Sequence, residues 1–427
     1  MGKTPKNLLV LALTVKLWYI EYGCRSGHLQ ICPLLYCVSQ RIAYEICRED
    51  YGTVSTKKEN LDRKLIEVCR HFRIPGEYRF CEEIKVGNVN KTYKVTFEGE
   101  DPKNPGQTRL KSYMVQAVNT FAFKNPVQVM DNIDKVTEYI HAKDPDRRAL
   151  HFHHTHDRKT YVFDKSGFWR LFNYIPSVTY SVTDNLQVIY NAGLAFGDFQ
   201  MMLSDFDASQ LHETIPDFHN TIKRYEQLEQ QVAADPVDRV KEVKEEIAWL
   251  QSVKEQACKL TKLQQEGVLP LRVTHNDTKI NNVLFDKDTD DALVVIDLDT
   301  VMPGLVGHDF GDAVRFAANL VEEDSLDYEK AGVNMEIFRA FAEGFLSKTA
   351  QSLSQPELDT LALSCLALTC ELATRFLADY IAGDVYFKTN YDEHNLVRTR
   401  CQIALAKDML RKLPQMEEIV RDCVKKL

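Results

Sequence analysis

The sequence predicts an α+β protein with a sheet-rich first lobe, a connecting strand and a helical second lobe that holds one small hairpin. Segments rich in β-branched and aromatic residues, with turn residues between them, come first along the chain. From residue 218 onward, apolar residues recur at helical spacings instead. Two short apolar strands then flank an acidic turn within the helical part. Such an arrangement leaves a cleft between the lobes, where small ligands usually bind.

Length and charge narrow the class of protein. A chain of 427 residues is long enough for two or three domains or for one large two-lobed unit. With 44% hydrophobic and 27% charged residues, it has the composition of an ordered globular protein. The formal net charge of −9 gives no electrostatic footprint for nucleic acid or an anionic membrane. We therefore expect a small-molecule partner, without nucleic acid or membrane, and the oligomeric state stays open.

Residues 1–55 differ in pattern from the rest and are expected to form an N-terminal extension. The run Leu8 to Val15 imitates the apolar part of a secretory signal, which is the alternative, but Lys16 interrupts it and no A-x-A-like site follows. No run reaches the ~18 apolar residues of a membrane span. The eleven Cys include no C-x-x-C pair, which argues against a disulfide framework and a zinc ribbon. A cytoplasmic location is therefore expected.

The elements are expected in a definite order. A nucleotide-binding N-lobe with its hinge is expected over residues 56–176, and a helical C-lobe over residues 177–427. The N-lobe should hold a short helix over 61–72, a helix from Asn125-Pro126 to Asp144-Pro145, and strands over 80–86, 91–97, 109–118, 159–164 and 168–174. The C-lobe should hold two long helices split at Asp235-Pro236, then the hairpin strands 283–285 and 293–296, and helices to the end.

One stretch carries the chemistry. His275, Asp277 and Asn282 form an H-x-D-x-x-x-x-N pattern directly before a strand, and Asp297 closes the next strand twenty residues after Asp277. Phosphoryl transfer by a kinase needs a carboxylate that receives the hydroxyl proton, an amide that holds a metal, and a second carboxylate that brings Mg²⁺ to the phosphates. The alternative is that Asp277 and Asn282 only cap and turn a loop. The hairpin between Asn282 and Asp297 favours the kinase interpretation.

On these residues the chain resembles the aminoglycoside phosphotransferase-like kinases, which include choline kinases, and most of all the N-acetylhexosamine 1-kinases. The resemblance covers roughly Leu61 to Leu427 and rests on the segments 115–119, 123–126, 274–285, 295–304 and 309–313. It implies a two-lobed protein-kinase-like fold with ATP and Mg²⁺ as cofactors. It also implies Asp277 as the catalytic base, with Asn282 and Asp297 as Mg²⁺ ligands.

Supporting roles follow from the same resemblance. Lys279 would touch a phosphate, a solvated loop lysine being the alternative, and His275 would orient the loop through backbone hydrogen bonds. Asp309 or Asp312 would brace the catalytic loop or cap a helix through Phe316.

In the N-lobe, Gly87 and Asn90 match the family's phosphate-facing turn, although the turn has no G-x-G-x-x-G and a plain hairpin turn is the alternative. Gln116 stands where many kinases have the phosphate-pairing Lys. Asn173 and Tyr174 lie in a segment that resembles the adenine-binding hinge.

For the acceptor, the resemblance implies the anomeric hydroxyl of an N-acetylhexosamine (GlcNAc or GalNAc). Phe316, Arg375 and Tyr386 lie in segments that resemble the family's sugar pocket, and a structural role is the alternative for each. The charges of residues 361–427 nearly balance, which favours a neutral sugar over a polycationic aminoglycoside. Because Arg375 lies on an apolar helix, we expect a polar partner for its guanidinium. A choline- or aminoglycoside-type kinase, or a catalytically silent nucleotide-binding regulator, are the alternatives.

Two other patterns imitate metal sites. Asp286 to Asp297 has the spacing of an EF-hand loop, but Asp291 replaces the Gly at its sixth place and strands flank it. The tract 151–156 holds four His between a helix and a strand and is expected to be a loop.

Overall fold

The computed structural model describes residues 58–85 and 89–427. The chain divides into two compact units, residues 1–70 and 71–427. In the first unit, residues 58–69 are helical, within the region where a short helix is predicted. The predicted N-terminal extension lies outside the described residues, and the lobe boundaries predicted at 56 and 177 stay predictions. Everything that follows concerns the second unit.

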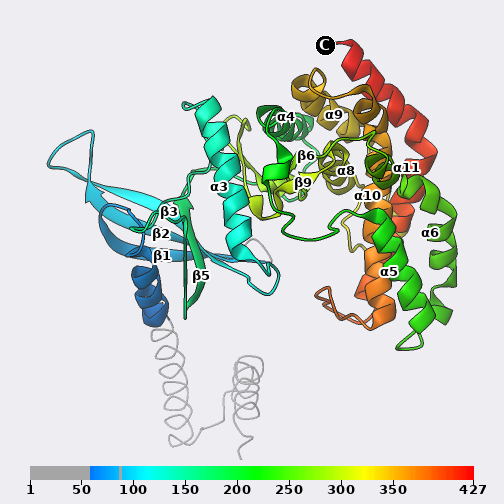
Figure 1. Cartoon of the computed structure of the whole chain (residues 1–427), viewed down its shortest axis with the longest axis horizontal. Coiled ribbons are helices and arrows are strands. Elements are labelled where there is room, and N and C mark those ends of the chain that lie inside the picture. Colours follow the sequence, from blue (N-terminus) through cyan, green and yellow to red (C-terminus); the bar gives the residue numbers. More distant parts are fainter. Residues whose placement is uncertain (1–57, 86–88) are drawn as a thin grey trace, which may run out of the picture. The chain divides into compact units, whose positions relative to one another are not determined.

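The second unit begins with a five-stranded antiparallel sheet in the order β1-β2-β3-β5-β4 (Figure 1). Its strands are β1 (Glu77–Ile84), β2 (Lys91–Glu100), β3 (Thr108–Val118), β4 (Tyr161–Asp164) and β5 (Gly167–Asn173). All five lie at or near their predicted places, because β-branched and aromatic residues favour a pleated, half-buried surface. The register places Gln116 of β3 directly opposite Arg170 of β5.

Helix α3 (Pro126–Lys143) connects β3 to β4, as predicted. Pro126 stands in its first turn, where the missing N–H costs nothing, and the helix ends at Asp144. Val129, Ile133 and Val136 form its buried stripe, at the spacing of one helix face.

The rest of the unit is mainly helical. The helices are α4 (Leu186–Met202), α5 (Thr221–Ala234), α6 (Lys244–Ala257), α7 (Lys259–Gln265), α8 (Val306–Ala317), α9 (Met335–Thr349), α10 (Gln355–Ala382) and α11 (His394–Lys425). Short 3₁₀ turns are η1 (Ala208–Gln210), η2 (Val240–Glu242), η3 (Ile280–Asn282), η4 (Leu298–Thr300) and η5 (Tyr328–Lys330). The predicted break between two long helices is confirmed, since α5 ends at Asp235 in the left-handed conformation.

Four short strands lie among these helices. The predicted hairpin is present as β7 (Val283–Phe285) and β8 (Ala292–Val295). A second pair joins β6 (Arg272–Thr274) to β9 (Met302–Gly304). The expectation of helices from the hairpin to the C-terminus is therefore wrong at β9, and also over residues 318–334, where η5 is the single helical turn. Pro303 explains the first departure, because proline lacks the N–H that a helix interior needs.

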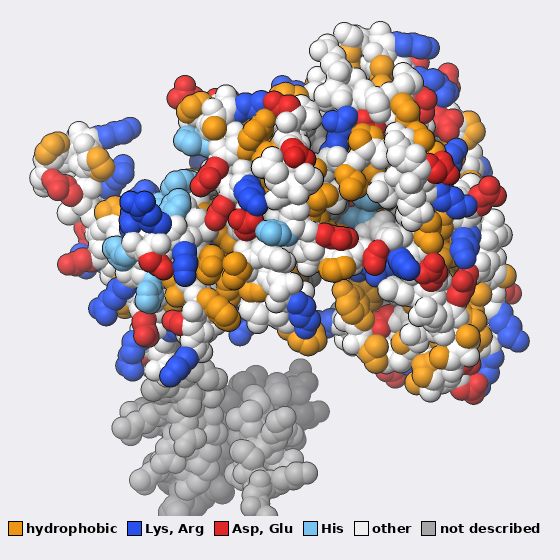
Figure 2. All heavy atoms as spheres, viewed as in Figure 1, with side chains coloured by type: hydrophobic (Ala, Val, Ile, Leu, Met, Phe, Trp, Pro, Cys, Tyr) orange, Lys and Arg blue, Asp and Glu red, His pale blue; other side chains and the backbone are white. Residues whose placement is uncertain are grey.

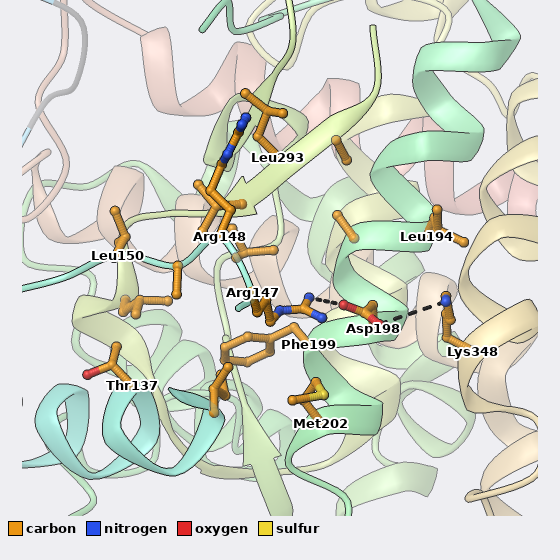
Figure 3. Close-up of a pocket in the computed structure, with 17 residues that line it drawn as sticks. Thr137, Arg147, Arg148, Leu150, Leu194, Asp198, Phe199, Met202, Leu293 and Lys348 are labelled. Atoms are coloured by element: carbon orange, nitrogen blue, oxygen red, sulfur yellow. Dashed lines mark hydrogen bonds and ion pairs between the residues drawn. The ribbon is translucent and has the colours of Figure 1, made fainter. Parts of the chain in front are cut away.

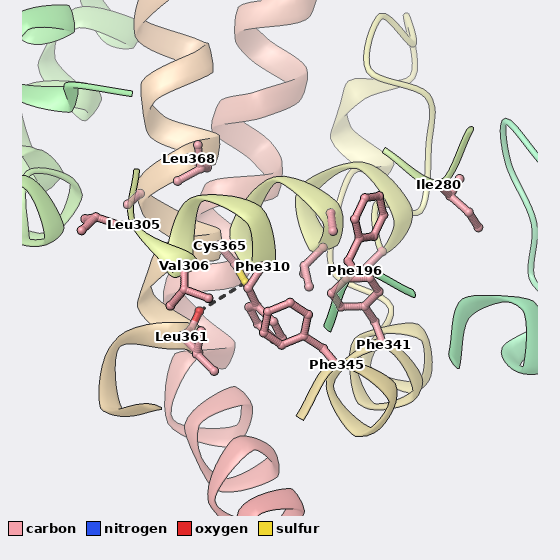
Figure 4. Close-up of a cluster of buried hydrophobic side chains, with 14 of the residues drawn as sticks. Phe196, Ile280, Leu305, Val306, Phe310, Phe341, Phe345, Leu361, Cys365 and Leu368 are labelled. Carbon is pink, nitrogen blue, oxygen red and sulfur yellow. Dashed lines mark hydrogen bonds between the residues drawn. The ribbon is translucent and has the colours of Figure 1, made fainter. Parts of the chain in front are cut away.

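The helical part packs around α10, which contacts α5, α8 and α11. Phe310 of α8 is fully buried, and its ring lies 5.4 Å from that of Phe345 and 5.7 Å from that of Phe341 (Figure 4). Among the described residues, α10 is long and apolar enough to cross a membrane by length and composition. However, 83% of its most apolar window is buried inside the structure, as in the core helix of a globular domain.

Candidate active site

The catalytic-loop candidate Asp277 lies between β6 and η3, with both carboxylate oxygens engaged. Lys279 Nζ lies 2.8 Å from Oδ1, and the Asn282 amide donates to Oδ2 at 3.1 Å. The same amide donates to the Asp277 carbonyl at 2.8 Å. The structure thus brings Asp277, Lys279 and Asn282 together, and it aims the Asp277 carboxylate through local contacts within one short loop.

His275 holds this loop to the β7–β8 hairpin. Its Nδ1 accepts from the Asp277 backbone N–H at 3.3 Å, and its Nε2 lies 2.8 Å from the Ile296 carbonyl. The first contact needs a lone pair and the second a proton, so the network selects the neutral ring with the proton on Nε2. Edge contacts with the rings of Phe196 and Phe199 fix the ring plane. This is the orienting geometry expected for His275.

The Asp309 carboxylate, on α8, holds the backbone of this loop through hydrogen bonds. It accepts the backbone N–H groups of His275 and Asn276 at 2.9 and 2.7 Å, and the Gln200 amide at 2.6 Å. Burial raises the pKa of Asp309, while these hydrogen bonds oppose that shift. Asn276 has a φ of 63°, and its amide donates to the Thr300 carbonyl. The strained turn that presents Asp277 is therefore held from two sides.

Asp312, the other bracing candidate, takes part in a different network. Arg315 binds it at 2.9 Å and binds Glu323 at 2.6 Å. Although burial opposes ionisation, the charges of Arg315 and Lys279 lower the pKa of Asp312. Desolvation likewise opposes the Lys279 charge, but Asp277 and Asp312 outweigh it and raise the pKa of Lys279. Lys279 is thus a paired cation beside the proposed base.

Asp297 stands two residues after β8, directly before η4, in a left-handed conformation with a φ of 61°. The Ile296 N–H donates to the Asn282 carbonyl at 2.8 Å, so the chain segments that carry Asn282 and Asp297 meet where they enter and leave the hairpin. Asp297 keeps part of its surface exposed to solvent, while nearby protein atoms displace much of the water around its carboxylate. Loss of surrounding water, together with the charges of Asp299 and Asp277, raises its pKa. Within the described residues, no hydrogen-bond donor reaches its carboxylate, which leaves two oxygens for a cation.

A buried ion pair that the sequence did not reveal lies next to Asp297. The Arg170 guanidinium, from β5, pairs with the Asp299 carboxylate, and both side chains are under 5% exposed. Gln116 accepts from Arg170 at 2.9 and 2.7 Å, and the Asn90 amide donates to Asp299 at 2.6 Å. Gln116 therefore orients an arginine from the neighbouring strand, and that arginine supplies a cation beside the site.

The remaining N-lobe candidates differ in how the structure places them. Asn90 is tied to Asp299 and accepts from the Asn119 N–H at 3.0 Å, while Gly87 lies outside the described residues. The Asn173 side chain accepts from the His151 N–H at 2.7 Å. Lys94 lies 4.6 Å above the Tyr174 ring. Nucleotide contacts for these four residues stay predictions.

Arg375 and Tyr386 lie near one another at the end of α10. The Arg375 guanidinium lies 5.7 Å from the Phe218 ring and 5.5 Å from the Phe387 ring, and Phe387 contacts Tyr386. Among the described residues it makes no hydrogen bond or ion pair. A half-buried guanidinium can lie against aromatic faces and keep its edges in water, so Arg375 needs no polar partner from the described chain, and a partner from a bound substrate stays a prediction.

The loop that carries Tyr386 is held by Asp379. Its carboxylate accepts the backbone N–H groups of Val385, Tyr386 and Phe387 at 2.8 to 3.0 Å, so the 73% exposed Tyr386 side chain has a fixed base. Phe316 packs partly buried against the core instead. No ring or cation contact joins Phe316 to Arg375 or Tyr386 within the described part of the chain.

A second network that sequence reasoning missed ties α10 to the catalytic loop. His219 Nδ1 lies 3.1 Å from Glu371, one turn before Arg375, and its Nε2 lies 3.3 Å from the Asn276 carbonyl. Both ring nitrogens face acceptors, so the ring carries two protons. Burial opposes this charge, but Glu371 outweighs burial and raises the pKa of His219. The partners are 57 and 152 residues from His219 in sequence, so no local pattern could indicate them.

The sequence profile of the phosphotransferase enzyme family matches residues 122–341, just over half of the chain. The chain belongs to this family. The matched span of this phosphotransferase includes the loop that carries Asp277, the hairpin and α8, whereas Asn90, Arg375 and Tyr386 lie outside it.

Solved structures show the fold of the phosphotransferase. A microcompartment-associated aminopropanol kinase is 14% identical with a TM-score of 0.53, covering 85% of this chain and 98% of its own. A choline kinase from Cryptosporidium parvum is 15% identical with a TM-score of 0.50, covering 85% and 99%. An aminoglycoside phosphotransferase from Alicyclobacillus acidocaldarius is 10% identical with a TM-score of 0.53, covering 84% and 96%. The predicted α+β, kinase-like fold is confirmed.

The donor set of the phosphotransferase suits Mg²⁺. Magnesium prefers oxygen ligands and is usually held by one or two carboxylates, with waters and phosphates completing its shell. Asp297 offers a carboxylate without a hydrogen-bond donor among the described residues, and Asn282 offers an amide oxygen next to it. The residues present therefore fit the predicted metal.

Proposed function

We propose that this phosphotransferase is an ATP-dependent kinase that phosphorylates a small alcohol, and that the alcohol is the anomeric hydroxyl of an N-acetylhexosamine. The arrangement of Asp277, Asn282 and Asp297 on one loop and one hairpin carries the first part of the proposal. A catalytically silent regulator would not need a base and two metal ligands in place. We further propose that it acts in the reducing cytoplasm, where the described cysteines stay free thiols.

In this mechanism Asp277 receives the proton of the acceptor hydroxyl as its oxygen bonds to the γ-phosphorus of ATP. The bond from that phosphorus to the bridging oxygen breaks, and ADP leaves. Asn282 fixes the Asp277 carboxylate, and Lys279 places a positive charge beside the transferred group. Bound Mg²⁺, held by Asn282 and Asp297, would neutralise phosphate charge.

The surroundings of Arg375 support a neutral acceptor over a cationic one. The acceptors named for two of the similar structures, choline and aminopropanol, are amino alcohols that carry a positive charge. Burial and, after it, the nearby charge of Arg375 lower the pKa of Arg224, and the charge of Glu371 opposes this only in part. A cationic acceptor would meet repulsion from both guanidinium groups. A sugar could instead accept hydrogen bonds from Arg375 and stack against Tyr386.

A panel assay tests the proposal. ATP consumption is measured with N-acetylglucosamine, N-acetylgalactosamine, choline, ethanolamine and an aminoglycoside. We expect turnover with an N-acetylhexosamine and little with the cationic alcohols. Arg375→Ala should raise KM for the sugar at least about tenfold with KM for ATP little changed. Arg421→Ala, at an exposed position of α11, is the matched control and should change neither. Preference for choline would overturn the sugar assignment, and equal effects on both substrates would indicate lost folding.

A further inference from the structure

A cavity of about 370 Å³ opens beside strand β8 of the hairpin (Figure 3). It lies among α3 and the segment after it, α4, β8 and α9. Its volume falls in the range of small-molecule sites. None of the proposed catalytic or substrate residues lines it, so it does not belong to the phosphoryl-transfer site.

The walls of this cavity are mostly apolar. Leu194, Phe199 and Met202 of α4 form one side, and Leu150 and Leu293 lie opposite. A hydrated ion would gain little from such walls, whereas a short hydrocarbon chain would leave water on binding.

The charges at its rim are unbalanced. Asp198 pairs with Arg147 and lies 3.9 Å from Lys348, as the dashed lines in Figure 3 show. Arg148 also lines the cavity, and among the described residues it has no hydrogen bond or ion pair, only a longer-range attraction to Asp286. Three cations and one carboxylate thus line the cavity, and Arg148 points toward Leu293, away from Asp198. The surplus favours a ligand with an anionic head.

We propose that this cavity binds a small amphipathic anion, with an apolar chain along α4 and β8 and a carboxylate or phosphate head at Arg148. The proposal does not depend on which alcohol the kinase phosphorylates. Two residues that line the cavity, Phe199 and Leu298, place such a ligand close to the candidate active site. Phe199 contacts the His275 ring, and Leu298 lies between Asp297 and Asp299.

Equilibrium dialysis of the full chain, without nucleotide or metal, tests the proposal with labelled octanoate, hexyl phosphate and octan-1-ol. We expect one or both anions to bind, and octan-1-ol to bind at least about tenfold more weakly because it offers no charge to Arg148. Binding of one anion alone identifies the head group. If neither anion binds up to about 10 mM, or if octan-1-ol binds as tightly, the proposal is wrong.

Two variants locate the ligand. Arg148→Ala removes an exposed cation that pairs with nothing described, and should weaken anion binding about tenfold. Lys259→Ala makes the same charge change at an exposed position outside the cavity and should leave binding unchanged. Ala195→Leu places three extra carbons into the cavity and should abolish binding of every probe. Far-UV circular dichroism checks that each variant is folded. Unchanged binding by both cavity variants would overturn the assignment.

Discussion

Asp277 illustrates how single residues share the work of the site. Its two oxygens are held by different neighbours, Asn282 and Lys279, so the carboxylate is oriented and its negative charge is partly compensated before any substrate arrives. The backbone that carries it is in turn fixed by Asp309 and by His275. Preorganisation of this kind lowers the cost of reaching the transition state.

Asp277→Asn should therefore abolish turnover and leave nucleotide binding largely intact. The variant keeps the side-chain volume but removes the proton acceptor, and general-base contributions are typically ~10² to 10⁴ in rate. Single-turnover kinetics and a fluorescent-nucleotide titration measure the two effects. Asp288→Asn, on the exposed turn of the same hairpin, is the control and should behave as the native chain does. A kcat above about a tenth of the native value would show that Asp277 is not the base.

The metal assignment leads to a separate prediction. Asn282→Ala and Asp297→Ala should each raise the Mg²⁺ concentration needed for activity. The effect of Asp297→Ala should be larger, because it removes a charge as well as a ligand. A Mg²⁺ titration of kcat measures this. If both variants titrate like the native chain, the metal lies elsewhere.

At the scale of elements, helices α4 and α9 pack closely against each other. The spacing of apolar residues in the sequence does not indicate this close approach. Gly193 and Gly197 of α4 and Gly344 of α9 lie where the backbones approach. A Cβ on Gly344 would lie 2.1 Å from the Tyr190 carbonyl oxygen. Helix α4 is buried on several sides and lacks a single apolar stripe, so the sequence did not predict it.

Gly344→Ala should destabilise the protein by about 1 to 3 kcal/mol, or more if the two helices cannot separate. Urea unfolding followed by circular dichroism measures the change. Glu343→Ala, one residue earlier on the same helix and at its surface, should change the free energy of unfolding far less. Native stability for Gly344→Ala would mean that the two helices are not held at this distance.

Helix α3 provides a pH-dependent prediction. Burial raises the pKa of Asp134 to about 6, even though Thr160 donates a hydrogen bond to it. The folded state therefore holds this proton at pH values where the unfolded chain, with a carboxyl pKa of 3.8, has lost it. The contribution of this proton to the free energy of unfolding is complete below pH 3.8. It decreases as the pH rises and is lost above about pH 6.

Asp134→Asn, which keeps an acceptor for Thr160 but carries no charge, should raise stability at pH 8 by about 1 to 2 kcal/mol, allowing for partial exposure. At pH 4 the gain should be much smaller. Thermal unfolding at both pH values measures the difference. An equal gain at both values would exclude the charge as its cause.

At the scale of the whole molecule, elements that depend on local sequence patterns could be predicted, whereas contacts between distant residues could not. Strands, α3 and the hairpin follow from residue types and spacing, and the structure places them as expected. The catalytic role of the Asp277 loop stays a prediction. The Arg170–Asp299 pair joins positions 129 apart, and nothing in the flanking residues of Arg170 indicates a buried cation. Arg375 lies on a helix that was predicted from local spacing, but the aromatic rings of Phe218 and Phe387 that surround it come from two other segments of the chain.

The Arg170–Asp299 pair connects the five-stranded sheet to the helical part, and its removal should affect how the whole second unit unfolds. Asp299→Asn leaves a buried guanidinium without its carboxylate, and breaking such a pair costs about 3 to 5 kcal/mol. Arg170→Met should be similarly harmful, because it leaves the Asp299 charge buried.

The double variant Arg170→Met/Asp299→Asn should recover part of this loss, because neither buried charge then remains. Urea unfolding of the native chain, both single variants and the double variant gives the coupling free energy. Glu98→Gln/Arg79→Met, at an exposed ion pair of the same sheet, provides the matched cycle and should show a much smaller coupling, because water screens exposed charges. Additive losses at Arg170 and Asp299 would show that the pair does not join the sheet to the helices.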